Sequence, residues 1–368
     1  MKVALVYDRV NKWGGAERLL LALKKIFPDA DLFTSVYNKE KAQWAKSFKI
    51  KTTFLQDFPF ASSSHEFYGA LMPIAFESFS FDDYDLVISI TSEAAKGIIT
   101  KPETLHICFC LTPTRYLWSG YKTYFQNYVF RVLTKPVVWY LRLWDKIASQ
   151  RPDEFIAISN ETQKRIKKYY NRDSKVIYPP VTLGIRGQSP EVNSKLQAPA
   201  ASNYFLVVSR LVPYKNIDLA IAACKELNLP LKIVGNGSEK GYLKAISSKN
   251  IEFLGEISDK ELISCYQNCA ALIFPGVEDF GLSMVEALAF GKPVIAFKGG
   301  GALEIVKEGV IGEFFESPTI ESLKEVLINF SPSRYNSENC IKQAQKFSFE
   351  EFERNLRNFL AAKFSKTL

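Results

Sequence analysis

Histidine is scarce in this chain of 368 residues, which has only His65 and His106. The chain also lacks a CxxC pair and an HExxH motif, so the sequence predicts no zinc site. No stretch is expected to span a membrane, because the longest uncharged run, residues 262–277, has only 16 residues and includes Ser, Gln and Asn. A secretory signal is not expected either, because the first apolar run ends at Asp8.

The six cysteines are spread along the chain without the density of a disulfide scaffold, so we expect them to be reduced in a cytoplasmic protein. His106 shares an apolar run with two of them, which favours a core histidine over a catalytic one. The formal net charge of +8 favours an anionic partner: nucleic acid, a lipid headgroup or a phosphorylated substrate. An apolar fraction of 47% and a charged fraction of 23% exclude a disordered chain.

Short apolar runs alternate with helical patterns from end to end, which is typical of parallel sheets covered by helices. At roughly 150 residues per domain the length favours two domains. We therefore predict an α/β protein with two Rossmann-like, doubly wound domains. The predicted strands are residues 3–7, 85–90, 105–111, 155–159, 176–178, 204–209, 231–234, 251–254, 270–274 and 294–297.

A Pro-, Gly- and Ser-containing stretch with little periodicity separates the two series of elements and predicts a linker. The last residues form an amphipathic helical pattern. Two such domains leave a cleft between the carboxyl ends of their sheets, where ligands bind. The predicted divisions are an N-terminal domain at 1–185, the linker at 186–203, a C-terminal domain at 204–346 and a terminal helix at 347–368.

Two glycines, Gly14 and Gly15, stand between the first strand and the first helix. Because they lack a Cβ atom, backbone N–H groups there can approach an anion at the helix N-terminus. The pattern is neither a GxGxxG fingerprint nor a P-loop, and turn chemistry alone also explains it.

Arg210 and Lys215 lie between the strand predicted at 204–209 and the following helix. Two cations at such a place can clamp a diphosphate, with Arg210 as a bidentate donor and Lys215 as a point charge. The alternative is a solvated basic loop.

Glu286 is the only charged residue between Gly281 and Gly291, in a helix that otherwise looks buried. A buried carboxylate needs strong hydrogen-bond donors, and sugar or ribose hydroxyls in a cleft are such donors. Glu278 precedes this helix by about one turn, where it can reach the same ligand. The alternative is a helix-capping acid with a structural ion pair. A glycine cluster at 299–301 is a weaker candidate anion site.

At these residues the chain resembles the family-four retaining glycosyltransferases of GT-B fold. GGAER after the first strand, Arg210 with Lys215, and the E-x7-E pair Glu278/Glu286 occur in the family's order and spacing. The stretches EDFGLSMVEALAFGKPVIAFKGGGALEIV and LTPTRYLW most resemble bacterial GDP-mannose-dependent mannosyltransferases of O-antigen and exopolysaccharide synthesis. The resemblance implies two domains facing across a cleft, with the terminal helix crossing back to the acceptor-binding N-terminal domain.

The resemblance also implies a role for each matching residue. Gly14 and Gly15 would face the donor phosphates and the acceptor, while Arg210 and Lys215 would hold the diphosphate and stabilise charge on the leaving group. Such enzymes need no metal and no cofactor, because cations and helix dipoles replace the ion. Sugar hydroxyls would be contacted by Glu278 and by backbone amides, and ribose by Glu286; the amides belong to Phe280, Gly281 and Leu282.

Leu111 and Glu93 stand where relatives often carry histidine, Leu111 within what would be an HTP motif. Leucine donates no hydrogen bond, so its interaction with the donor must be replaced or lost. Either donor handling is altered, turnover is slow, or catalysis has been lost. We expect an active enzyme with altered donor handling.

Residues 115–151 contain seven Lys or Arg and one acid, interleaved with ten aromatic residues. A helical stripe of Tyr121, Tyr124, Phe125 and Tyr128 favours contact with anionic lipid at the inner face of the plasma membrane. Against this, Lys135 falls on the stripe's own face and Pro136 interrupts the helix, so a buried interdomain helix explains the pattern equally well.

The leading hypothesis is a cytoplasmic, peripheral membrane glycosyltransferase. It would move a hexose, mannose by preference, from a nucleotide diphosphate sugar, with GDP-mannose favoured, to a lipid-linked or polysaccharide acceptor. A catalytically impaired nucleotide-sugar or glycan-binding protein of the same fold is the alternative. A nicotinamide- or nucleic-acid-binding protein is disfavoured, because the dinucleotide motif is absent and basic residues concentrate only at 115–151.

Overall fold

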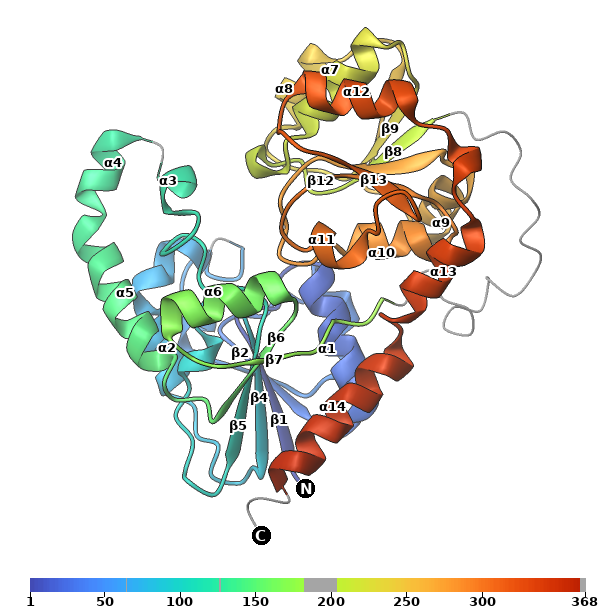
Figure 1. The fold of residues 1–368 in the computed structure, drawn as a ribbon. Helices are drawn as coiled ribbons and strands as arrows, with labels where there is room; N and C mark the ends of the chain where they lie inside the picture. Colours follow the sequence, from blue (N-terminus) through green and yellow to red (C-terminus); the bar gives the residue numbers. More distant parts are fainter. Residues whose placement is uncertain (64, 126, 182–203, 365–368) are drawn as a thin grey trace. The chain divides into compact units, whose positions relative to one another are not determined.

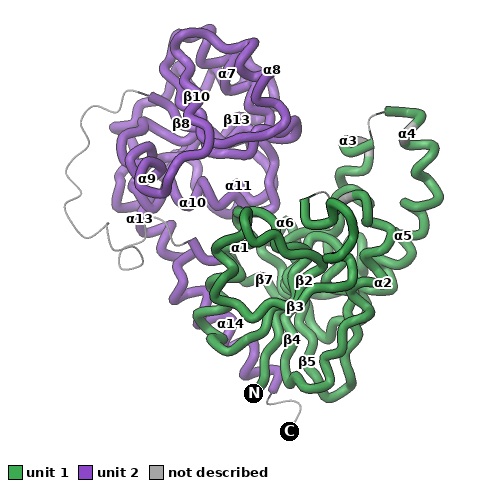
Figure 2. The backbone as a smooth tube through the Cα atoms, turned by 180° about the vertical axis from the view of Figure 1, so that it is seen from behind, with its two compact units in different colours: residues 1–179 green, residues 180–368 purple. Residues whose placement is uncertain are grey.

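The computed structural model describes residues 1–63, 65–125, 127–181 and 204–364 (Figure 1). The chain divides into two compact units, residues 1–179 and 180–368 (Figure 2). The linker predicted at 186–203 lies outside the described residues.

The first unit is built on a sheet whose described strands are all parallel, in the order β3-β2-β1-β4-β5-β6-β7. Its central strands are apolar and buried along their whole length, because helices cover both faces of such a sheet. The strands are β1 Val3–Tyr7, β2 Asp31–Thr34, β3 Ile50–Thr52, β4 Leu86–Thr91, β5 Leu105–Cys110, β6 Glu154–Ala157 and β7 Lys175–Val176. The helices are α1 Gly15–Ile26, α2 Met72–Glu77, α3 Tyr121–Tyr124, α4 Tyr128–Leu133, α5 Lys135–Ala148 and α6 Asn160–Tyr170.

The second unit repeats this plan with a parallel sheet in the order β10-β9-β8-β11-β12-β13. Aliphatic side chains of its strands pack with those of α7 and α12 into one apolar core. The strands are β8 Phe205–Val208, β9 Leu231–Val234, β10 Ile251–Gly255, β11 Ala271–Phe274, β12 Val294–Phe297 and β13 Gly312–Phe315. The helices are α7 Ile217–Glu226, α8 Lys240–Ile246, α9 Asp259–Asn268, α10 Leu282–Ala289, α11 Ala302–Ile305, α12 Ile320–Asn329, α13 Ser337–Gln345 and α14 Phe349–Phe364.

Two parallel, Rossmann-like sheets confirm the predicted α/β fold class. Each strand predicted from an apolar run is present within one or two residues of its expected ends. Three strands that the sequence analysis did not predict, β2, β3 and β13, complete the sheets. No helix among the described residues is long and apolar enough to cross a membrane.

His106 and the cysteines lie inside the fold. All six cysteines are buried and free of disulfides. His106 is fully buried in β5, where its Nε2 lies 2.9 Å from the Ser89 hydroxyl, and burial together with Arg172 and Arg151 lowers its pKa to about 3. It is a neutral core histidine, as the sequence indicated.

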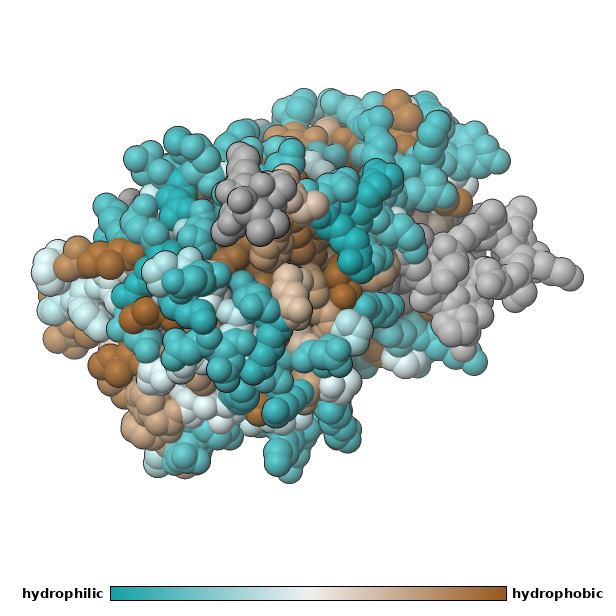
Figure 3. All heavy atoms as spheres, turned by 90° about the horizontal axis from the view of Figure 1, so that it is seen from below, coloured by the Kyte–Doolittle hydropathy of each residue, from teal (hydrophilic) through white to brown (hydrophobic). Residues whose placement is uncertain are grey.

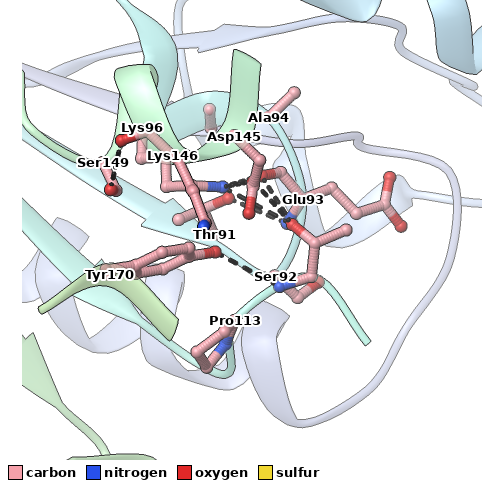
Figure 4. A network of polar contacts seen from close by, with 12 residues as sticks. Thr91, Ser92, Glu93, Ala94, Lys96, Pro113, Asp145, Lys146, Ser149 and Tyr170 are labelled. Atoms are coloured by element: carbon pink, nitrogen blue, oxygen red, sulfur yellow. Dashed lines mark hydrogen bonds and ion pairs between the residues drawn. The ribbon is translucent and has the colours of Figure 1, made fainter. Parts of the chain in front are cut away.

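A buried ion pair fastens α5 to the loop that follows β4 (Figure 4). Lys96 Nζ lies 2.5 Å from Asp145 Oδ1, with both side chains 1% exposed. Asp145 also accepts hydrogen bonds from Thr114 Oγ1 at 3.0 Å and Trp118 Nε1 at 2.7 Å, while Lys96 donates to the Glu93 carbonyl. Burial alone would lower the pKa of Lys96, but the Asp145 carboxylate outweighs it and raises that pKa. Lys96 therefore stays charged, and both side chains of the pair have further hydrogen-bond partners.

We predict that Lys96→Met lowers the free energy of unfolding of the first unit by about 3–5 kcal/mol, because it leaves the Asp145 carboxylate buried without its cation. Urea unfolding measures the loss. The exposed pair Lys324–Glu226 is the control, and Lys324→Met should cost less than about 1 kcal/mol. Equal losses in the two variants would contradict the role of the buried pair.

Candidate functional site

Several of the predicted site residues follow strands that flank the point in each sheet where the strand order reverses. In the first sheet the chain runs outward from β1 to β3 and returns at β4, and in the second it runs outward from β8 to β10 and returns at β11. Loops after the two strands that flank such a reversal diverge, which leaves room for a ligand. Arg210 follows β8 and Glu278 follows β11, so both flank the reversal in the second unit.

Lys215 and Glu278 meet as an ion pair at this place. Lys215 ends a short 3-10 helix, η5 Pro213–Lys215, in the loop after β8, and its side chain is 10% exposed against 20% for Glu278. The structure thus brings together two residues that stand 63 positions apart and that the sequence analysis assigned to one site. Both side chains are therefore largely shielded from water.

Gly276 allows the two loops to approach each other. A Cβ atom built on Gly276 would lie 2.9 Å from Lys215 Cα and 3.0 Å from Lys215 O, closer than carbon atoms tolerate. Backbone therefore packs directly on backbone here, and the position of Lys215 relative to Glu278 is fixed by main chain rather than by flexible side chains. The sequence analysis did not single out Gly276.

The glycine cluster at 299–301 supports the Glu278 loop from the other side. Gly301 N donates to Glu278 O at 2.9 Å, and a Cβ atom on Gly301 would lie 2.1 Å from Phe280 O. Gly300 has φ +57°, and a Cβ atom there would lie 2.3 Å from Glu278 O. The sequence suggested an anion site for this cluster, but its observed contacts are with the backbone of residues 278–280.

Arg210 is exposed and donates from Nη2 to Tyr214 Oη at 2.6 Å. Lys215 Nζ lies 5.4 Å from the centre of the same Tyr214 ring. The two predicted cations therefore share Tyr214 as a neighbour, which places both on one side of the loop. Tyr214 was missed by the sequence analysis, although it stands beside Lys215 in the chain.

Helix α10 begins directly after the Glu278 loop. Gly281, with φ +107°, is its N-cap, a conformation that L side chains rarely adopt. Phe280 is buried edge-on against Phe347, with ring centres 5.4 Å apart, whereas Gly281 and Leu282 are partly exposed. The first N–H groups of a helix have no partner within it and carry partial positive charge, so this end of α10 suits an anion or a sugar hydroxyl.

Glu286 lies one turn into the interior of α10 and is 4% exposed. Its Oε2 accepts a hydrogen bond from Tyr266 Oη at 2.7 Å, and Tyr266 is fully buried in α9, stacked on Phe290. The sequence analysis required strong donors for this carboxylate and expected them from a ligand. One of them is a tyrosine of the chain itself, which the sequence did not reveal.

In the first unit, Asp8 holds the loop after β4 at the carboxyl edge of the sheet. It follows β1 and is 3% exposed, and its carboxylate accepts hydrogen bonds from the loop after β4, including the backbone N–H groups of Ser92 at 2.7 Å and Ala94 at 2.9 Å. Burial, then the charge of Glu93, raises the pKa of Asp8. Asp8 was missed because its partners lie more than 80 residues away.

Glu93 is paired with Arg9, whose Nη1 lies 2.5 Å from Glu93 Oε1. Burial would lower the pKa of Arg9, but nearby charges, Glu93 foremost, raise it. Leu111, partly exposed after β5, donates its N–H to Thr91 O at 2.8 Å. Glu93 and Leu111, the two positions where the resemblance suggests a departure from the family pattern, thus follow neighbouring strands, β4 and β5, and the charge of Glu93 is balanced by Arg9.

Gly14 and Gly15 lie at the N-terminus of α1, at the same edge of the first sheet, and both are at least partly exposed. One turn into α1, Glu17 is 1% exposed and accepts a hydrogen bond from Tyr7 Oη at 2.6 Å. Burial and the neighbouring Glu17 carboxylate raise the pKa of Tyr7 well above its usual value, so Tyr7 remains a donor. The motif therefore has a structural core, Glu17, and an accessible glycine turn.

Within the described ranges, no group of three or more His, Cys, Asp and Glu side chains is placed to hold a metal ion. Arg210, Lys215 and the N-terminus of α10 contribute positive charge at the second sheet edge.

The chain is similar to known proteins over the part that carries the second-unit site. Residues 188–347 match the family model "Glycosyl transferases group 1", and this range includes Arg210, Lys215, Glu278 and Glu286. An uncharacterized glycosyltransferase of Methanocaldococcus jannaschii is 32% identical over 57% of this chain and 60% of its own length. A GDP-mannose-dependent phosphatidylinositol monomannoside mannosyltransferase of Corynebacterium glutamicum is 32% identical over 33% of this chain and 35% of its own length. The chain thus spans about three fifths of the first relative and about one third of the second.

Among solved structures, Anabaena HepE in complex with UDP-glucose superposes with a TM-score of 0.70 at 19% identity, over 98% of this chain and 100% of that one. This likeness concerns the fold. The chain has the two Rossmann-like domains of the GT-B fold, and its residues 188–347 are similar to the group 1 glycosyltransferases.

Proposed function

We propose that this chain is a retaining glycosyltransferase that moves a hexose from a nucleoside diphosphate sugar to a lipid-linked or polysaccharide acceptor. The observation that carries the proposal is the contact between Lys215 and Glu278, with Arg210 beside it, where the strand order of the second sheet reverses. A cation and a carboxylate side by side match the two ends of such a donor, a diphosphate and a sugar.

In this mechanism Lys215 and Arg210 neutralise the diphosphate. An ammonium group has three protons, so Lys215 can donate to Glu278 and to a phosphate oxygen at the same time. Arg210 adds a planar fork that suits a second phosphate oxygen. As the bond to the sugar breaks, negative charge grows on the leaving diphosphate, and fixed cations in a partly shielded site stabilise it without a metal ion.

The sugar and the nucleoside would be held by the Glu278 loop and α10. Glu278 would accept hydrogen bonds from sugar hydroxyls, supported by backbone amides of Phe280, Gly281 and Leu282, while Glu286 would bind the ribose. Glu286 already accepts one bond from Tyr266, which fixes the orientation of its carboxylate.

The acceptor would bind at the edge of the first unit, near Gly14, Gly15 and Leu111. Retention of configuration is consistent with attack from the face that the diphosphate leaves, in which the departing phosphate takes the proton of the acceptor. No carboxylate nucleophile is then required, in contrast to retaining glycoside hydrolases.

We propose mannose as the sugar and GDP-mannose as the donor, in the cytoplasm. This is supported by the resemblance of the Glu278 stretch and by the Corynebacterium relative, whose printed name specifies GDP-mannose. The pairing of Glu93 with Arg9 supports altered donor handling over lost catalysis, because the new charge is balanced rather than left to disrupt the site.

We predict that Glu278→Gln lowers the turnover of sugar transfer or donor hydrolysis by about 100-fold, because the amide removes a charged acceptor at the reacting sugar. Assays with GDP-, UDP- and ADP-sugars measure the turnover. Glu252→Gln, at an exposed pair with Lys232 in the same unit, is the control and should keep wild-type activity. Wild-type turnover in Glu278→Gln would refute the sugar contact, and nucleotide binding without turnover in the parent protein would favour the catalytically impaired alternative.

We also predict that Gly301→Ala weakens nucleoside diphosphate sugar binding by about tenfold or more, because the added methyl group displaces the backbone of residues 278–280. Calorimetric titration measures the dissociation constant. Gly241→Ala is the matched control, since nothing lies within 4 Å of a Cβ atom built there. Equal dissociation constants in the two variants would show that the loop position does not govern binding.

A further inference from the structure

An apolar face runs along α4 and α5 of the first unit, far along the chain from the residues assigned to transfer. Large apolar side chains are exposed there in an unusual concentration, and Trp139 and Leu133 are 68% and 72% exposed. In Figure 3, apolar side chains gather at the left edge of the view, where α4 and α5 lie in Figure 1. The exposed set is Tyr124, Tyr128, Val129, Val132, Leu133, Val137, Trp139, Tyr140, Leu143 and Ile147, which we call the α4–α5 face.

The only acid of this segment is buried, so its exposed charges are basic. Residues 115–151 contain a single acid, Asp145, and that carboxylate is buried in the ion pair with Lys96. Lys135 and Lys146 are exposed among the apolar residues. The α4–α5 face therefore combines aromatic and aliphatic side chains with basic ones, and its only acid is turned inward.

The opposite side of α5 is already packed. Val138, Leu141 and Asp145 are buried, and Arg142 Nε donates to Leu117 O at 2.7 Å. Pro136 lies in the first turn of α5, where proline is tolerated, directly after the helix break that the sequence suggested: α4 ends at Leu133 and α5 begins at Lys135. Helix α5 therefore packs on the first unit through one face and leaves the opposite face exposed.

The sequence analysis left a buried interdomain helix as an equal alternative; within the first unit, the outer side of α5 is not covered. The predicted aromatic stripe is also not one continuous helix. Helix α3 ends at Tyr124, and Tyr121 and Phe125 pack inward beside Leu117, whereas Tyr124 and Tyr128 are exposed.

We propose that the α4–α5 face docks on an anionic lipid bilayer. Exposed Trp, Tyr and Leu side chains suit the boundary between headgroups and acyl chains, and basic side chains beside them suit anionic headgroups. A symmetric dimer through the same face is disfavoured, because this segment has no exposed acid with which Lys135 and Lys146 of the other copy could pair. Docking here would bring the first unit, the proposed acceptor side, to the surface where a lipid-linked acceptor resides.

Cosedimentation with vesicles tests this surface without any donor or acceptor, so its outcome is separate from that of the transfer reaction. The protein should bind vesicles of phosphatidylcholine and phosphatidylglycerol, bind pure phosphatidylcholine vesicles at least about fivefold more weakly, and lose binding at high salt. Equal binding to both vesicle types, or binding to neither, would overturn the proposal.

Paired variants locate the contact. Trp139→Ser with Leu143→Ser should lower the partition coefficient at least about tenfold, because two exposed apolar side chains no longer enter the interface. The control, Tyr242→Ser with Ile328→Ser, removes equally exposed apolar side chains from the second unit and should leave binding unchanged. Equal losses in both pairs would overturn the assignment to α4–α5.

Charge reversal separates the electrostatic contribution. Lys135→Glu with Lys146→Glu should lower binding at least about tenfold more than Lys244→Glu with Lys260→Glu, which change the net charge equally on the second unit. Loss of binding equal in both pairs would indicate a response to net charge alone. A dimer in solution that Trp139→Ser with Leu143→Ser dissociates, together with no vesicle binding, would replace the bilayer by a second copy of the chain.

Discussion

The ion pair between Lys215 and Glu278 depends on a close approach of two backbones, and the proposed chemistry depends on that pair. Parallel topology brings the loops after β8 and β11 to one edge of the sheet, but topology alone leaves room for many loop positions. Two glycines restrict the possible loop positions, because Gly276 packs on the backbone of Lys215 and Gly301 packs on the backbone of Phe280. The charged groups are thus held by main chain at both sides, which is the preorganisation that electrostatic stabilisation of a leaving group requires.

In the first unit, a buried carboxylate rather than glycine holds the loop at the sheet edge in place. A buried carboxylate, Asp8, gathers the N–H groups of the loop after β4, and this loop presents Glu93 to Arg9. The adjoining Lys96–Asp145 pair links that loop to α5, whose outer face is the proposed lipid contact. One chain of polar contacts therefore runs from the sheet edge to the helix that faces outward, so the orientation of α5 and the shape of the loop are set together.

Much of the fold could be predicted from the sequence, because strands buried on both faces appear as uninterrupted apolar runs. The strands that were missed lack this signal: β2 begins with Asp31, β3 is three residues long with Lys51 at its centre, and β13 contains Glu313. The resemblance assigned Lys215 and Glu278 to one site, but it did not predict that the two side chains pair with each other. The roles of Tyr266 and Asp8 could not be predicted, because they follow from partners brought close only by folding.

If fixed cations at the edge of the second sheet hold a diphosphate, calorimetric titration with a nucleoside diphosphate measures their contribution to binding. We expect Lys215→Ala and Arg210→Ala each to raise the dissociation constant about tenfold or more, since each removes a charge-assisted hydrogen bond. Lys260→Ala, on the exposed surface of the same unit, should leave it unchanged, as should addition of EDTA to the parent protein. Unaltered binding in both cation variants, or binding abolished by EDTA, would contradict the account.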